Sequence, residues 1–153
     1  MDVATSEFLT KDGKHDLDFK EQPANVHSGS SLVELYKEFV RDFPIVSIED
    51  PFDQHNWSSW AALQSVVNIQ LVGDDLLMTN PRGITKGIEK KACNALLMKI
   101  STVTESIQAA LASKVVGWGV MVSHQSGETE DKFIADLAIG LANGKVQERN
   151  IMF

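Results

Sequence analysis

Four side chains of types that take part in chemistry each follow a short apolar run: Glu49, Asp74, Lys99 and His124. They recur at intervals of 25 residues, and each is followed by a segment with helical signals. A repeating strand and helix unit of this length returns the chain to the same end of a parallel sheet. We therefore expect the four side chains to emerge on one face, at the carboxyl ends of the strands, where α/β folds bind their ligands.

The two acids of this set predict a metal site. Glu49 and Asp74 on adjacent strands would repel each other unless a cation lay between them, and Asp2 can supply a third carboxylate. Mg²⁺ prefers oxygen ligands and keeps positions for water or substrate. Lys99 beside such a site can serve as a general base if the cation and burial lower its pKa.

His124 and Ser126, with backbone N–H groups near the start of the next helix, can hold a phosphate or a carboxylate. Plainer interpretations compete with these roles. A single acid at a strand end is more often a helix cap or a solvated turn residue, and we keep that interpretation for Asp75. A lone lysine is usually exposed or paired, and His124 alone could equally make a structural hydrogen bond. The convergence of the four strand ends favours a site.

Helical and strand patterns alternate from residue 32 onward. Apolar residues at helical spacing, helix caps and glycine ends predict helices over 32–43, 56–67, 80–92, 102–113 and 128–144. Short apolar runs predict strands over 44–50, 69–75, 95–100 and 118–124. Strands that are apolar on both faces and alternate with helices indicate an α/β fold with a parallel sheet.

The first 31 residues are less regular than the rest of the chain. Residues 1–8 fit one more strand, whereas residues 11–31 are rich in turn formers and predict an exposed loop that contains His15 and His27. Neither a linker nor a low-complexity tract interrupts the 153 residues. We expect a single domain.

Composition excludes several classes of protein. The net charge is −7 and no Lys or Arg cluster occurs, which argues against binding to nucleic acid. Cys93 is the single cysteine, so it is expected to be a buried apolar side chain, with no disulfide inside the chain. No stretch has the length of a membrane span, and the N-terminus does not have the pattern of a signal peptide. We expect a cytoplasmic location.

Several motifs of the chain resemble those of enolase, which interconverts 2-phosphoglycerate and phosphoenolpyruvate in glycolysis. In chain order they are SIEDPFDQ, QLVGDDLLMTNP, ACNALLMK, GWGVMVSH and SGETEDKFIADLAIGL. The resemblance runs from Met1 to about Gly144. It implies an incomplete TIM-type (βα) barrel, from about the third barrel strand to the start of the eighth and open where the first two strands are missing. It also implies that the N-terminal enolase domain is not part of this sequence.

The resemblance assigns roles to individual residues. It implies that Asp2, Glu49 and Asp74 hold Mg²⁺ and that Lys99 removes the proton α to the substrate carboxylate. The expected contacts to 2-phosphoglycerate or phosphoenolpyruvate come from seven residues, namely Glu49, Asp74, Ser123, His124, Gln125, Ser126 and Gln147. Enolases are commonly dimers, so a homo-oligomer or a hetero-oligomer with an enolase is a further expectation.

Departures from the family pattern weaken the expectation of activity. The glutamate that acts as general acid in the family would lie upstream of Met1. The loop after Lys99 is about three residues shorter than in the family, Gln125 replaces an arginine, and Gln147 replaces a lysine. Each lost cation plausibly costs on the order of 10²–10³ in rate, by analogy with the loss of an oxyanion-hole donor.

Two hypotheses about function follow from this sequence. One is an active phosphopyruvate hydratase, a Mg²⁺-dependent lyase. The other, which we favour, is an enolase-like chain that is catalytically impaired and at most binds Mg²⁺ or another protein. Because an open barrel exposes unpaired strand edges, we also expect a tendency to aggregate or to fold only with a partner.

Overall fold

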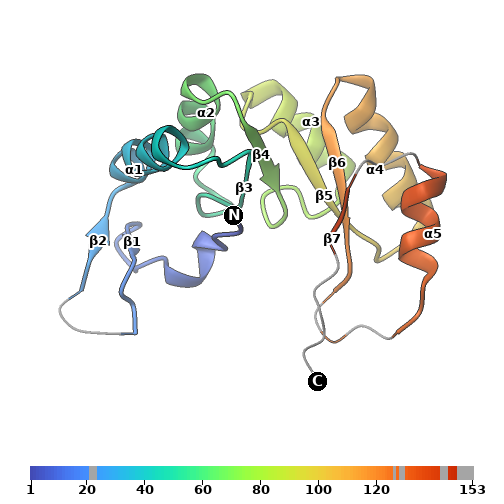
Figure 1. The fold of residues 1–153 in the computed structure, drawn as a ribbon, viewed down its shortest axis with the longest axis horizontal. Coiled ribbons are helices and arrows are strands. Elements are labelled where there is room, and N and C mark those ends of the chain that lie inside the picture. Colours follow the sequence, from blue (N-terminus) through green and yellow to red (C-terminus); the bar gives the residue numbers. More distant parts are fainter. Residues whose placement is uncertain (21–23, 126, 128–129, 142–144, 148–153) are drawn as a thin grey trace.

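The computed structural model describes residues 1–20, 24–125, 127, 130–141 and 145–147. Its main sheet has five parallel strands in chain order, namely β3 (Ser47–Glu49), β4 (Gln70–Gly73), β5 (Ala95–Lys99), β6 (Gly119–Ser123) and β7 (Lys145–Gln147). Within the described part the sheet curves but does not close into a barrel (Figure 1). The predicted α/β fold, an incomplete TIM-type barrel, is confirmed.

Helices occupy the outer side of the curved sheet (Figure 1). They are α1 (Gly29–Asp42), α2 (Trp57–Val66), α3 (Pro81–Lys90), α4 (Val103–Val115) and α5 (Phe133–Gly140). The predicted cap at the start of α3 is confirmed, because the Asn80 side chain accepts a hydrogen bond from the backbone N–H of Arg82 and Pro81 opens the helix. The last helix was predicted too long: residues 130–132 precede it, and Asp131 accepts from the N–H of Phe133.

The N-terminal segment lies along the free edge of β3. Asp2 forms a parallel bridge with Glu49, where the N–H of Val3 donates to the Glu49 carbonyl at 3.0 Å and the N–H of Glu49 donates to the Met1 carbonyl at 2.8 Å. Beyond Ala4, with φ at +48°, the chain turns into the 3-10 helix η1 (Thr5–Phe8). The strand predicted over residues 1–8 is therefore confined to its first residues.

The prediction of an exposed loop over residues 11–31 is wrong in part. β1 (His15–Asp16) pairs antiparallel with β2 (Val26–His27), and α1 already begins at Gly29. His15 is fully buried, with the ring of Phe8 edge-on to it at 6.2 Å between centroids. Phe8 in turn stacks on Phe19 at 5.9 Å. These aromatic contacts join the hairpin to η1.

The two faces of the sheet carry separate apolar clusters. Alternate residues of a strand point to opposite faces. Leu96 and Met98 of β5 pack into the core beneath the helices, whereas Leu97 belongs to a smaller cluster on the concave face. Cys93 is buried in the helix-side core, which confirms the burial predicted for it, and Trp60 is buried in the same core. In the described residues, no helix has both the length and the apolarity of a membrane span.

Candidate functional site

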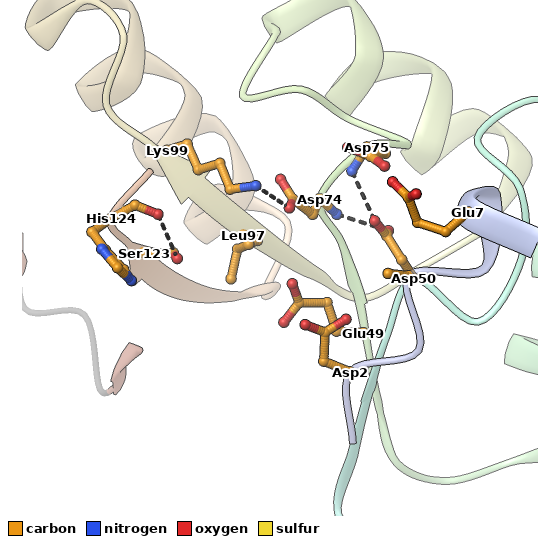
Figure 2. A pocket seen from close by; sticks show the side chains of 11 residues that line it. Asp2, Glu7, Glu49, Asp50, Asp74, Asp75, Leu97, Lys99, Ser123 and His124 are labelled. Atoms are coloured by element: carbon orange, nitrogen blue, oxygen red, sulfur yellow. Dashed lines mark hydrogen bonds and ion pairs between the residues drawn. The ribbon is translucent and has the colours of Figure 1, made fainter. Parts of the chain in front are cut away.

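The carboxyl ends of the strands surround one cavity of about 370 Å³. Glu49 ends β3, Lys99 ends β5, and Asp74 and His124 directly follow β4 and β6. All four line the cavity, as the sequence predicted (Figure 2). Its described walls carry six carboxylates and a single lysine; the carboxylates belong to Asp2, Glu7, Glu49, Asp50, Asp74 and Asp75.

Glu49 is a buried acid that lacks a protein donor. Its residue is 8% exposed, and within the described residues its carboxylate accepts no hydrogen bond. Burial, and then the charges of Asp2 and Asp74, raise the pKa of Glu49 to about 7. A buried carboxylate that faces other carboxylates provides the hard oxygen donors that a divalent cation prefers. The residues present therefore fit a metal ion.

Asp50 holds the ends of two strands together. It is 4% exposed with φ at +41°, and its two carboxylate oxygens accept the backbone N–H groups of Asp74 and Asp75, each at 3.0 Å. Its carbonyl accepts the Thr5 hydroxyl at 2.7 Å, which fixes η1 to the same point. Burial raises the pKa of Asp50 to about 7, although the two N–H donors oppose the shift.

A second grouping of acids overlaps the predicted metal set. Carboxylate oxygens of Asp50, Asp74 and Asp75 all lie within 4.8 Å of one another, close enough to share a metal ion. Asp74 belongs both to this group and to the predicted set of Asp2, Glu49 and Asp74. Because both oxygens of Asp50 already accept backbone N–H groups, Asp74 and Asp75 are the acids of this group that could turn toward a cation.

Lys99 forms an ion pair with Asp74 at the centre of the site (Figure 2). Burial is the largest single influence and lowers the pKa of Lys99, but the hydrogen bond to Asp74 and the negative charges of the nearby carboxylates together outweigh it, so the pKa is raised. This is opposite to the direction a general base requires. A cation that took Asp74 as its ligand would remove the hydrogen bond from Lys99 to Asp74, which is the largest of the effects that raise the pKa of Lys99. The backbone N–H of Lys99 donates to the Thr79 hydroxyl at 2.9 Å, which anchors the end of β5.

Ser123 and His124 approach the cavity from β6. Ser123 is paired in register with Lys99, and its hydroxyl donates to the His124 carbonyl at 3.0 Å. Both residues line the cavity together with the carboxylates (Figure 2). The site therefore combines a carboxylate-rich end, a lysine and a polar strand end.

The comparison with protein families agrees with this arrangement. A family model for the enolase C-terminal TIM barrel domain matches residues 1–151. The chain belongs to the enolase family. The match covers every predicted site residue; the family suggests a divalent metal, and the carboxylate cluster of Asp50, Asp74 and Asp75 could hold one.

The predicted enolase residues separate into two groups in the structure. Asp2, Glu49, Asp74, Lys99, Ser123 and His124 line the main cavity. Gln125 instead lines a neighbouring hollow of about 280 Å³. The backbone of Gln147 in β7 pairs with Ser123, while its side chain and all of Ser126 lie outside the described residues.

Two residues of this enolase site were missed by sequence reasoning. The sequence did contain a clue to the role of Asp50. It is a second acid directly after Glu49 and before Pro51, and an acid is unexpected at the end of an apolar strand. Glu7 reaches the cavity from η1 (Figure 2), and its sequence neighbourhood gave no sign of this. Asp75, interpreted as a turn residue, gives its N–H to Asp50 and also lines the cavity.

Proposed function

We propose that this chain keeps the metal-binding and proton-abstracting part of an enolase site, with Mg²⁺ bound through Asp2, Glu49 and Asp74. We further propose that it does not dehydrate 2-phosphoglycerate by itself. The observation that supports the metal role is Glu49, a buried carboxylate that accepts no hydrogen bond from the described residues, beside Asp2 and Asp74. A bound cation would offset the charge of this cluster, since burial of unpaired charge is costly.

The chemistry expected of these residues follows from their positions. When bound, Mg²⁺ would neutralise charge on the substrate carboxylate and so acidify its α proton. Asp74 would exchange its ion pair with Lys99 for the cation. The amine of Lys99, freed from Asp74, could then lose its proton and accept the α proton at Nζ. The N–H of Lys99 remains held by Thr79, which keeps the side chain directed into the cavity.

The charge balance of the site supports the proposed lack of turnover. Across its described lining, the main cavity offers Lys99 as its single lysine against six carboxylates. Gln125 and Gln147, which replace cations of the family pattern, contribute no positive charge. A phosphorylated carboxylate bound in this cavity would find few positive side chains to balance its negative charge. The loss of each cation costs on the order of 10²–10³ in rate.

Calorimetric titration of the full chain with Mg²⁺ tests the metal role. We expect saturable binding, weakened at least tenfold in Glu49→Gln and Asp74→Asn. Glu38→Gln, an exposed site on α1, serves as the matched control and should leave binding unchanged. A flat titration of the unmodified chain would sink the metal assignment.

The alternative, an active phosphopyruvate hydratase, is favoured by the presence of Lys99 and the three predicted metal ligands in one cavity. The ultraviolet absorbance of phosphoenolpyruvate decides between the two functions. With saturating Mg²⁺ and 2-phosphoglycerate, we expect no rise above the buffer signal. A rise that disappears in Lys99→Met would establish the hydratase and refute the proposed lack of turnover.

A further inference from the structure

A smaller hollow adjoins the main cavity and shares part of its wall. The shared wall consists of Asp74, Asp75 and Lys99, which line both spaces. The rest of the hollow is formed by Met78, Thr79, Ser101 and Gln125, and its volume is about 280 Å³. A ligand held at the carboxylates could therefore extend past Lys99 into this second space.

The side chains that belong to the hollow alone are uncharged. The Thr79 hydroxyl already has backbone partners, because it accepts the Lys99 N–H at 2.9 Å and lies 3.4 Å from the Leu97 carbonyl. Ser101 and Gln125 are exposed and present a hydroxyl and an amide, which can both donate and accept hydrogen bonds. Met78, 69% exposed, adds an apolar and adaptable side chain at the rim.

The charges on the wall of this hollow determine which ligand groups it can favour. The two carboxylates of its wall are offset only by Lys99, which is already paired with Asp74. Among the described residues, a phosphate group would meet this negative wall with Lys99, already paired with Asp74, as the single positive side chain. A hydroxyl group would meet the neutral donors and acceptors of Ser101 and Gln125. Size does not discriminate, since about 280 Å³ holds either group.

We propose that this hollow is a subsite for a neutral, hydroxyl-bearing substituent, so that the site takes small 2-hydroxycarboxylates in preference to phosphorylated ones. The inference rests on the proposed function, because the carboxylate end of the ligand would bind at the metal. Gln125 is the specificity-determining residue of this subsite, and Ser101 supports it.

The test uses the full chain saturated with Mg²⁺ and measures binding by calorimetry, with glycerate and 2-phosphoglycerate as probes. We expect glycerate to bind at least tenfold more tightly than 2-phosphoglycerate. Gln125→Arg should reverse this preference, and Gln125→Leu should weaken glycerate several-fold without strengthening 2-phosphoglycerate. Gln108→Arg, which adds the same charge at an exposed position of α4, is the control for net charge and should leave the preference unchanged.

The possible failures are distinguishable. If Mg²⁺ binds but 2-phosphoglycerate is the tighter ligand, or if Gln125→Arg leaves the preference as it was, the subsite is wrong and the metal assignment stands. If Mg²⁺ binds and neither probe does, the subsite is also refuted. If Mg²⁺ itself does not bind, both the proposed function and this inference fail. Circular dichroism of each variant confirms that a lost preference does not reflect a lost fold.

Discussion

The charge on Glu49 should oppose folding at neutral pH, and replacing it with glutamine isolates this effect. In the folded chain the pKa of Glu49 is raised from the ordinary value of 4.5 to about 7. Between these values the folded chain keeps a proton that the unfolded chain has released. Stability contributed by this proton is present at low pH and is lost as the pH rises through about 7.

The size of the effect follows from the same two values. One pH unit corresponds to about 1.4 kcal/mol, so a change from 4.5 to about 7 amounts to about 3 kcal/mol for Glu49 alone. Its 8% exposure leaves little room for solvent to screen the charge. We therefore expect Glu49→Gln to gain stability over the unmodified chain as the pH rises, reaching about 3 kcal/mol at pH 8.

Urea unfolding followed by tryptophan fluorescence, in the presence of a chelator, measures this difference at each pH. Trp60 is buried and provides the signal. His15, whose pKa is lowered by burial, and Asp50 also titrate in this range, but both are present in the two proteins and largely cancel in the difference. A difference that stays constant from pH 4.5 to 8, or that favours the unmodified chain at pH 8, would refute the reasoning. Added Mg²⁺ should stabilise the unmodified chain at pH 8 and leave Glu49→Gln almost unchanged.

Three further outcomes can be checked independently. Lys99→Met removes the ammonium that competes for Asp74, so Mg²⁺ should bind about tenfold more tightly by calorimetry; equal or weaker binding would contradict the ion pair. Thr79→Val leaves the backbone N–H of Lys99 without its acceptor and should lower the free energy of unfolding by about 1–3 kcal/mol in urea, whereas an unchanged midpoint would show that this contact is dispensable. Cys93 is 3% exposed and burial raises its pKa to about 12, so an aromatic disulfide reagent should modify it only in urea; rapid labelling of the folded chain would contradict this burial.

Much of the fold could be predicted because its signals are local. The alternation of apolar runs with amphipathic segments fixed the order of strands and helices, and Asn80 with Pro81 marked the start of α3. The convergence of Glu49, Asp74, Lys99 and His124 followed from parallel strands ending at one edge. These inferences need only the period of the pattern and the handedness common to all such units.

The remainder depends on contacts between distant residues. Asp50 accepts backbone N–H groups 24 and 25 residues away, which no local pattern reveals. The hairpin of β1 and β2 is held by the packing of Phe8 against His15 and Phe19, so its two-residue strands could not be recognised in a segment rich in turn formers. A lowered pKa of Lys99 was expected only if a cation and burial acted together, and nothing in the sequence indicated that Asp74 pairs with Lys99 and raises its pKa.

The order of the main sheet, in which every strand pairs with its neighbours in the sequence, makes the molecule a one-dimensional array of units. In such an array stability is shared between adjacent units, and an interior unit is supported from two sides. β4 and β5, which lead to Asp74 and Lys99, are interior strands, whereas the Asp2 bridge and β7 stand at opposite ends. Opening at the Asp2 end would therefore withdraw one of the proposed metal ligands while the central ion pair of Asp74 and Lys99 stays intact, so the proposed metal site and the lysine need not be lost together.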